Sequence, residues 1–445
     1  MLQVKKRNGI LVPFDKQRIV NAINKAFIEV DGTLYEEDTA NDIADEIKYN
    51  VKTADKIISV EEIQDMVEDF LMRSERKDVA KTYIRYRYKR EVARSGRDDF
   101  IKAFSEKING TAIENQNANV DEMSFGGRVG AGSDLQMKKY ALDYCVSDMA
   151  RRNHENNEIY IHDLSAYAVG MHNCLSIPFD DLLAKGFNTR QTDVRPAGSV
   201  NTAFQLVAVI FQLQSLQQFG GVSATHLDWT MVPYVRKSFW KHYRDGMKYI
   251  VLKPTNTNII WNLNDYLEDS DKYNRIEDIP ITDYSAYPNM PDDMGNFDEV
   301  YDYAMDMTIK EVHQAVEGMY HNLNTLQSRS GNQLPFTSIN YGTCTLPEGR
   351  MVTKALLDVS IEGLGKLHKT SIFPCGIFQC MKGVNQKPGD PNYDLFRLAL
   401  RSTATRLYPN YANVDWSGNT GYDINDPKTY FSTMGKRKLS PSKIF

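Results

Sequence analysis

Residues 1–92 combine a turn between short apolar runs with a series of amphipathic helical stretches. An Asn-Gly pair at residues 8–9 separates two apolar runs, which is a strong signal for a β-hairpin. Asp15 is placed to cap the first helix, and Ser59 with Glu62 has the spacing of a capping box. We therefore expect a hairpin followed by helices, at residues 16–30, 35–51, 59–72 and 78–96.

From about residue 93 the pattern changes to long helical stretches that alternate with short strand-like runs. This alternation favours an α/β architecture. The strand-like runs lead into loops with Gly, Asn and Cys, where an α/β barrel carries its site, and Ser338 and Asn340 lie in one such run. A shorter run predicts a strand that ends at His162-Asp163. The longest stretches are helical at 199–221 and 296–326 and strand-like at 333–342 and 370–380.

Composition is that of a globular protein with a substantial core. The 445 residues are 42% hydrophobic and 25% charged, and this length suggests two or three domains or one barrel with an appendage. A net charge of −5 gives no broad attraction to nucleic acid or to a membrane surface, and no apolar run approaches a membrane span. Without a signal peptide, we expect reduced thiols in the cytoplasm at the five cysteines Cys145, Cys174, Cys344, Cys375 and Cys380.

The hairpin carries a cluster of cations that suits a polyphosphate. Lys5, Lys6 and Arg7 lie beside the turn, and Arg18 follows near the start of the first helix. Arginine binds phosphate bidentately and lysine supplies a point charge. Ser59 adds a hydroxyl at a helix start whose free amides can hold an anion. The alternative is a solvated charge cluster on an exposed hairpin.

The same residues resemble an ATP cone, a domain found mainly at the N-terminus of ribonucleotide reductases and of their repressors. The resemblance rests on the stretches VKKRNGILVPFDKQRIVNAINKAF, ISVEEIQDMVEDFLM and AKTYIRYRYKRE, and it covers residues 1–92. It implies an allosteric domain in which Lys6, Arg7, Arg18 and Ser59 contact ATP or dATP, with Lys5 beside them.

The remainder, up to residue 435, resembles anaerobic (class III) ribonucleoside-triphosphate reductases. The resemblance rests on EIYIHDLSAYAVGMHNCLSIPFDDLL, GNQLPFTSINYGT, GLGKLHKTSIFPCGIFQCMKGVN and RLYPNYANVDWSGN, among other stretches. It implies an α/β fold, the ten-stranded barrel of the glycyl-radical enzymes, incomplete in this chain. It also implies a ribonucleoside triphosphate substrate, formate as reductant, and a radical that an S-adenosylmethionine and iron–sulfur activase generates.

The resemblance assigns roles to individual side chains. A thiyl radical removes the 3′-hydrogen of the ribose, and Cys174, in MHNCLS, matches the second thiol, on the other face of the sugar. His162 and Asp163 shape the pocket or form a hydrogen-bonded core pair, and Ser338 with Asn340 also falls in the pocket. Cys174 has the alternative of a buried structural thiol. No metal site is expected, because Cys375 and Cys380 lack partner ligands nearby.

Oligomerisation follows from the same resemblance. The helix at residues 199–221 is expected at a homodimer interface, where members of the family bind the dNTP effector that selects the substrate base. The alternative is plain helix packing, and it is equally open for each residue of that helix.

At the end of the chain, the family has Met-Gly-Cys-Arg and this chain has Met434, Gly435, Lys436 and Arg437. Lysine cannot form a thiyl radical, so we expect this chain alone to be inactive. The further strands, the asparagine near the formate site, the zinc site and the radical-bearing glycine are expected to be missing, and residues 436–445 to be a basic tail outside the family.

Three hypotheses follow from this ending. In the first, the chain is the N-terminal portion of a reductase from an interrupted gene, completed by a separate C-terminal polypeptide. In the second, it is a catalytically dead regulatory protein that binds nucleotides. A pyruvate formate-lyase-like enzyme is disfavoured, because that group lacks an ATP cone and uses adjacent cysteines.

Overall fold

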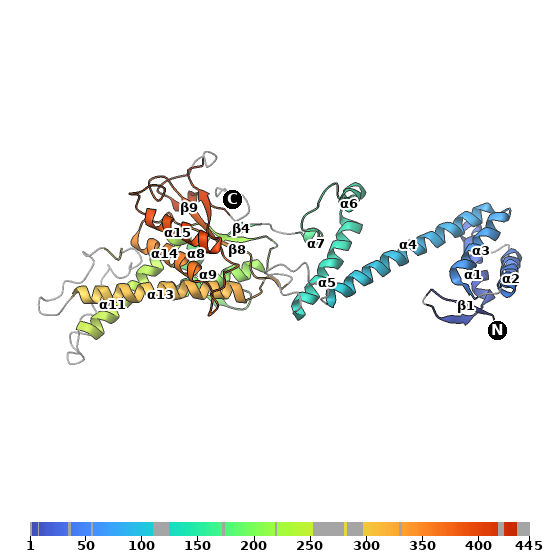
Figure 1. Cartoon of the computed structure of the whole chain (residues 1–445), viewed down its shortest axis with the longest axis horizontal. Coiled ribbons are helices and arrows are strands. Elements are labelled where there is room, and N and C mark those ends of the chain that lie inside the picture. Colours follow the sequence, from blue (N-terminus) through green and yellow to red (C-terminus); the bar gives the residue numbers. More distant parts are fainter. Residues whose placement is uncertain are drawn as a thin grey trace. The chain divides into compact units, whose positions relative to one another are not determined.

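The chain forms two compact units, Met1–Glu106 and Lys107–Phe445 (Figure 1). No helix among the described residues is long and apolar enough to cross a membrane. The computed structural model describes residues 2–7, 9–33, 37–54, 57–109, 124–170, 174–218, 220–251, 280–282, 297–328, 332–416 and 422–433.

The first unit contains a small sheet of three strands, in the order β2-β1-β3. Strands β1 (Gln3–Lys5) and β2 (Leu11–Pro13) are antiparallel, which confirms the expected hairpin. Gly9 in the turn has φ +81°, a conformation that glycine adopts without strain. Strand β3 (Ile58–Ser59) pairs in parallel with β1, so the hairpin lies directly beside the start of the third helix.

Four helices complete this unit, as the apolar spacing predicted. Asp15 caps α1 by accepting a hydrogen bond from the Gln17 amide, and Ser59 with Glu62 forms the capping box of α3. Apolar side chains of the helices and of β1 and β3 form one core. The helices are α1 (Lys16–Asp31), α2 (Glu37–Thr53), α3 (Val60–Arg73) and α4 (Lys77–Ile108).

The second unit contains a five-stranded sheet, in the order β10-β9-β8-β7-β4, in which every neighbouring pair is parallel. This confirms the α/β prediction. Closure of the sheet into a ten-stranded barrel, complete or incomplete, stays a prediction. The strands are β4 (Leu175–Ser176), β7 (Val222–Ala224), β8 (Thr337–Tyr341), β9 (Cys375–Cys380) and β10 (Asn410–Asn413), and a separate antiparallel pair joins β5 (Phe187–Asn188) to β6 (Asp193–Val194).

Helices cover the apolar face of this sheet, and the main core lies between these helices and the sheet (Figure 1). The stretches expected at 199–221 and 296–326 form α9 and α13, while those at 333–342 and 370–380 contain β8 and β9. The helices are α5 (Phe125–Tyr140), η2 (Ala141–Cys145), α6 (Asp148–Glu155), α7 (Leu164–Tyr167), α8 (Phe179–Lys185), α9 (Val200–Ser215), α10 (Leu227–Thr230), α11 (Val232–Gly246), η3 (Met247–Val251), α13 (Phe297–Thr325), α14 (Pro347–Glu362), α15 (Tyr393–Arg406) and η6 (Pro427–Thr429).

The strand expected to end at His162-Asp163 is wrong. The chain after α6 turns back instead, and the Ile159 amide donates to the Asn153 carbonyl of that helix. Asn157 and Asp163 have φ values of 61° and 54°, which a strand does not accommodate. The apolar side chains of this run lie largely in solvent, Tyr160 being 79% exposed, so burial does not favour a sheet here.

Candidate functional site

The two faces of the parallel sheet differ in character. Successive side chains of a strand point to opposite faces, and Val222, Ala224, Ile339, Tyr341 and Phe378 all enter the helical core. The opposite positions on β7, β8 and β9 include four polar side chains, Ser223, Ser338, Asn340 and Gln379, which we call the polar face; Cys375 and Ile377 of β9 lie on the same side of the sheet. All four polar side chains are at most 2% exposed.

A segment from far along the chain lies on this polar face. Residues 422–433, here called the strap, end in a stretch whose backbone is bound by buried amide side chains. Gln379 Nε2 donates to the Phe431 carbonyl at 2.8 Å. Asn340 Nδ2 donates to the Thr433 carbonyl at 3.0 Å, and Asn340 Oδ1 accepts from the Thr433 amide at 3.1 Å. The polar face is thus a binding surface for backbone.

Cys174 lies immediately before β4, beside the polar face. Its side chain is exposed, so the alternative of a buried thiol is wrong. Ser176 pairs in register with Ser223, and alternation along the strand assigns Cys174 to the same face as Ser176. The structure therefore brings the strand of Cys174 next to β7, and β7 next to the strand of Ser338 and Asn340.

The other predicted residues of this region lie elsewhere or outside the described residues. His162 Nδ1 forms an ion pair with Asp163, and the His162 side chain is 78% exposed, so this pair is not buried in a core. No contact of this pair with the polar face occurs among the described residues. Lys436 and its neighbours Met434, Gly435 and Arg437 lie outside the described residues.

A hydrogen-bonded array at the end of β7 has no counterpart in the sequence predictions. His226 Nδ1 lies 2.7 Å from Thr225 Oγ1, and His226 Nε2 lies 2.8 Å from Asp180 Oδ2 on α8. Thr230 donates to Asp180 Oδ1 at 2.7 Å, and Lys428 of the strap lies 3.5 Å from Asp180 Oδ2. Burial alone would raise the pKa of the Asp180 carboxyl, but the His226 and Thr230 hydrogen bonds and the Lys428 charge outweigh it and lower the pKa to about 2.

Asp228 fixes the loop that follows β8. Its fully buried carboxylate accepts hydrogen bonds from the Gly342 amide at 2.8 Å and the Cys344 amide at 2.9 Å. Burial raises the pKa of Asp228 despite these bonds, and burial also raises the pKa of the Cys344 thiol. Cys344 is therefore a protonated structural thiol. No local pattern predicts this role of Asp228, because the loop amides that it binds lie more than a hundred residues away.

The predicted nucleotide residues of the first unit are only partly brought together. Lys5 and Ser59 are register partners on adjacent strands, and Arg7 ion-pairs with Glu61 while donating to Gln64 at 2.9 Å. The hydrogen bond from Arg7 lowers the pKa of Glu61.

The remaining members of this set are placed differently. The Ser59 hydroxyl accepts from the Glu62 amide at 3.2 Å, so its oxygen already serves the helix cap. Arg18 pairs with Asp15 at 3.1 Å and is 74% exposed. Lys6 forms the hairpin turn through its backbone, donating to Ile10 and accepting from Gly9.

Arg87 on α4 extends the Arg7–Glu61 pair into a network that sequence reasoning missed. Its side chain is 16% exposed and lies within 3.3 Å of Glu61, 2.6 Å of Asp65 and 3.0 Å of Glu68. Glu61 thus joins the hairpin, through Arg7, to α4, through Arg87. The run of charges around Arg87 in the sequence was the available signal.

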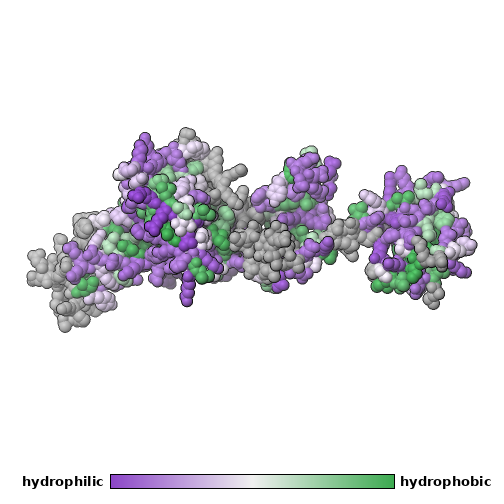
Figure 2. Space-filling model, in the orientation of Figure 1, coloured by the Kyte–Doolittle hydropathy of each residue, from purple (hydrophilic) through white to green (hydrophobic). Residues whose placement is uncertain are grey.

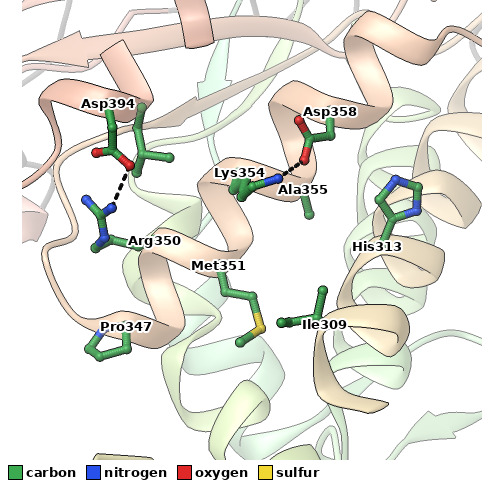
Figure 3. Close-up of a pocket in the computed structure, with 10 residues that line it drawn as sticks. Ile309, His313, Pro347, Arg350, Met351, Lys354, Ala355, Asp358 and Asp394 are labelled. Atoms are coloured by element: carbon green, nitrogen blue, oxygen red, sulfur yellow. Dashed lines mark hydrogen bonds and ion pairs between the residues drawn. The ribbon is translucent and has the colours of Figure 1, made fainter. Parts of the chain in front are cut away.

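A cavity of about 470 Å³ lies between α13, α14 and α15, away from the residues of the polar face (Figure 3). Ile309 and Met351 point toward one another at its base, and its charged groups pair among themselves. Arg350 lies 2.7 Å from Asp394, and Lys354 ion-pairs with Asp358. No cluster of three or more metal-ligating side chains occurs in the part of the chain that the structure describes.

Comparison with known proteins gives matches to both units. The ATP cone domain model matches residues 2–92, and the model of the anaerobic ribonucleoside-triphosphate reductase family matches residues 116–440. The anaerobic ribonucleoside-triphosphate reductase of Haemophilus influenzae is 30% identical over 414 residues, covering 92% of this chain and 52% of that protein. The enzyme of the same name from Escherichia coli K12 is 29% identical over 418 residues, covering 93% and 51%.

The chain therefore spans about half the length of these relatives. Among solved structures, the anaerobic ribonucleotide reductase from Thermotoga maritima in complex with dATP and CTP is similar at a TM-score of 0.41 and 13% identity, covering 66% of this chain and 44% of that one. The family model covers most of the chain, from residue 116 to residue 440. The first unit is an ATP cone, and the chain belongs to the anaerobic ribonucleoside-triphosphate reductase family.

Proposed function

We propose that this chain supplies the effector-binding domain and part of the catalytic sheet of an enzyme that reduces ribonucleoside triphosphates to deoxyribonucleoside triphosphates. The observation that carries the proposal is the convergence on one sheet face. The strand of Cys174, the buried Ser223 and Asn340, and the strap that leads toward residue 436 all meet there.

In this proposal Cys174 is the thiol that serves the ribose from one side. Its exposure beside a polar sheet face suits a group that must reach a bound sugar. It delivers its proton to the departing 2′-hydroxyl, which leaves as water, and, once reprotonated, it gives a hydrogen atom to C2′; formate then returns a hydrogen atom to the sulfur. The opposite side requires a thiyl radical, and formate supplies the two electrons and leaves as carbon dioxide. His162 and Asp163 are proposed to contribute from the pocket margin.

The thiyl position is occupied by Lys436, which cannot take part in hydrogen-atom transfer. We therefore propose that the isolated chain does not reduce nucleotides. We propose that activity uses a polypeptide that supplies a thiyl cysteine, together with an S-adenosylmethionine and iron–sulfur activase. The proposed assembly is a cytoplasmic homodimer, with α9 at the interface and a dNTP effector bound there.

The reconstituted reaction tests this function. The chain is incubated without oxygen with a ribonucleoside triphosphate, formate, the activase and a polypeptide carrying the C-terminal half of a family member. We expect deoxynucleotide only when all components are present, and a loss of at least about a thousandfold in Cys174→Ser. Cys145→Ser removes another exposed thiol and is the matched control. Undiminished product with Cys174→Ser would refute the assigned role.

A second function is favoured by Lys436 itself: a regulatory protein that binds nucleotides and does no chemistry. The first unit supports it, since Lys5, Lys6, Arg7, Arg18 and Ser59 are proposed to contact ATP or dATP. Isothermal titration with ATP and with dATP measures this binding. Nucleotide binding that persists while every reconstitution fails would favour the regulatory protein over the reductase.

A further inference from the structure

The polar face binds the strap through the strap's backbone, with two side-chain amides and with the Ser223 hydroxyl, which donates to the Thr433 carbonyl at 3.4 Å. Asn340 uses both its donor and its acceptor on one residue, Thr433, in the manner of a strand partner. Gln379 adds a bond to the Phe431 carbonyl, two residues earlier. Side chains of the strap contribute nothing to these bonds.

Asn340 is itself held in place by the neighbouring strand. Asn340 and Gln379 are both fully buried on adjacent strands, and the second hydrogen of Asn340 Nδ2 binds the Ala224 carbonyl at 2.9 Å. Burying a polar group without a partner costs free energy, and Gln379 Oε1 already has none, so a retracted strap would also deprive Asn340 Oδ1 and Gln379 Nε2 of their partners. The strap therefore completes the polar face.

The anchored end of the strap lies just before residue 436 in the sequence. Lys436, at the position where the family carries the thiyl cysteine, follows Thr433 by three residues. Three residues span at most about 11 Å. Fixing Thr433 against Asn340 thus fixes the point from which the chain continues toward residue 436.

We propose that Asn340 and Gln379 are positioning residues that anchor the strap backbone and thereby set where the segment around residue 436 is presented. This extends the role of Asn340 from pocket lining to loop anchoring, and it rests on the proposed function only for its relevance to catalysis. Because the anchor binds backbone, it tolerates different side chains in the strap.

Two measurements on the full chain test the anchor, and neither requires the chain to reduce nucleotides. Amide hydrogen exchange of a peptide covering Tyr430 to Thr433 follows the docking of the strap. We expect exchange in Asn340→Ala to rise about tenfold at Thr433, whose amide loses its acceptor, and to rise further with Gln379→Ala added. A nitroxide on K436C, in a background with serine at Cys145 and Cys174, should become more mobile in the same variants.

Asn324→Ala is the matched control. Asn324 Oδ1 also accepts from backbone amides, those of Ile372 and Phe373, but at a different place from the strap. This variant should lose global stability to a similar degree in urea while leaving exchange at Thr433 and nitroxide mobility at residue 436 unchanged. The same background without K436C corrects for label on other thiols.

Faster exchange and greater label mobility confined to the Asn340 and Gln379 variants support the anchor. Unchanged values in those variants, or equal increases in Asn324→Ala, overturn it. Because neither readout involves nucleotide reduction, a failed reconstitution would count against the proposed function and leave the result on the anchor intact.

Discussion

The ATP cone and the parallel sheet use polar side chains in opposite ways. In the cone, the candidate nucleotide residues are largely exposed cations that pair with carboxylates, as Arg7 does with Glu61 and Arg18 with Asp15. On the sheet, Asn340 and Gln379 are fully buried amides that bind backbone. Figure 2 shows that hydrophilic side chains dominate the visible surface, whereas the polar groups of the sheet lie within the fold.

This difference separates residues that can exchange partners from residues that cannot. An exposed ion pair contributes little net stability, so a phosphate can replace the carboxylate partner of Arg7 at small cost. A buried amide that loses its partner incurs a desolvation cost that nothing offsets. The cone is therefore suited to reversible binding, and the sheet is suited to holding a fixed geometry.

The largest expected effect comes from the buried carboxylate of Asp228, on α10. Asp228→Ala removes the acceptor of the Gly342 and Cys344 amides and leaves both unsatisfied in the interior. We expect a loss of about 3 kcal/mol in the free energy of unfolding, measured by urea denaturation. Asp228→Asn keeps one acceptor oxygen and should lose less. A loss below about 0.5 kcal/mol in the alanine variant would remove the contrast between buried and exposed groups.

A smaller effect should appear at the half-buried Asp180. Its pKa of about 2 in the folded protein lies below the ordinary value of 3.8. The folded state therefore stabilises the ionised carboxylate relative to the unfolded state. The stabilisation is full above about pH 5 and is lost as the pH falls through 4 toward 2, with a magnitude on the order of 2 kcal/mol.

Urea unfolding of the wild type and of Asp180→Asn at pH 6 and at pH 2.5 measures this contribution. The stability difference between the two proteins should shrink in acid, because the wild-type carboxyl is then partly protonated. A difference that stays constant between these pH values would show that the array of His226 and Thr230 does not hold the ionised form.

Local patterns in the sequence predicted the cone well and the sheet face only in outline. The hairpin, the Asp15 cap and the Ser59–Glu62 capping box each depend on residues within a few positions of one another. The strand carrying Ser338 and Asn340, β8, was also predicted. Gln379 was missed as a functional residue, because its partner Phe431 lies 52 residues away.

Long-range pairing also explains why the sequence did not predict the roles of His226 and Asp228. His226 meets Asp180 across 46 residues, and Asp228 meets Gly342 across 114. Alternation cannot reveal such pairs, since it reports which face a residue occupies and not which segment covers that face. The strand expected before His162 is wrong for the converse reason, because its apolar residues have the alternation of a strand but no strand of the described ranges pairs with them.

Within the cone, Arg87 is less exposed than Arg7 and Arg18. This side chain is only 16% exposed and contacts three carboxylates, so it lies between the two extremes. Arg87→Met keeps the apolar stem and removes the charge, and we expect a loss of about 1 kcal/mol in stability. Thermal unfolding at low and high salt measures it. A network dominated by charge should show a smaller difference between the two proteins at high salt.

The smallest stability effect is expected at Arg18, and it separates binding from folding. Its pair with Asp15 is exposed, so Arg18→Gln should leave the free energy of unfolding within about 0.5 kcal/mol of wild type. If Arg18 contacts the phosphates of ATP as proposed, the same variant should weaken ATP binding about tenfold, because a charge-assisted hydrogen bond is lost. Lys25→Gln, on the same helix and outside the proposed set, controls for net charge. Equal weakening in the two variants would assign the effect to the general field of the cone, and no weakening in either would remove Arg18 from the nucleotide site.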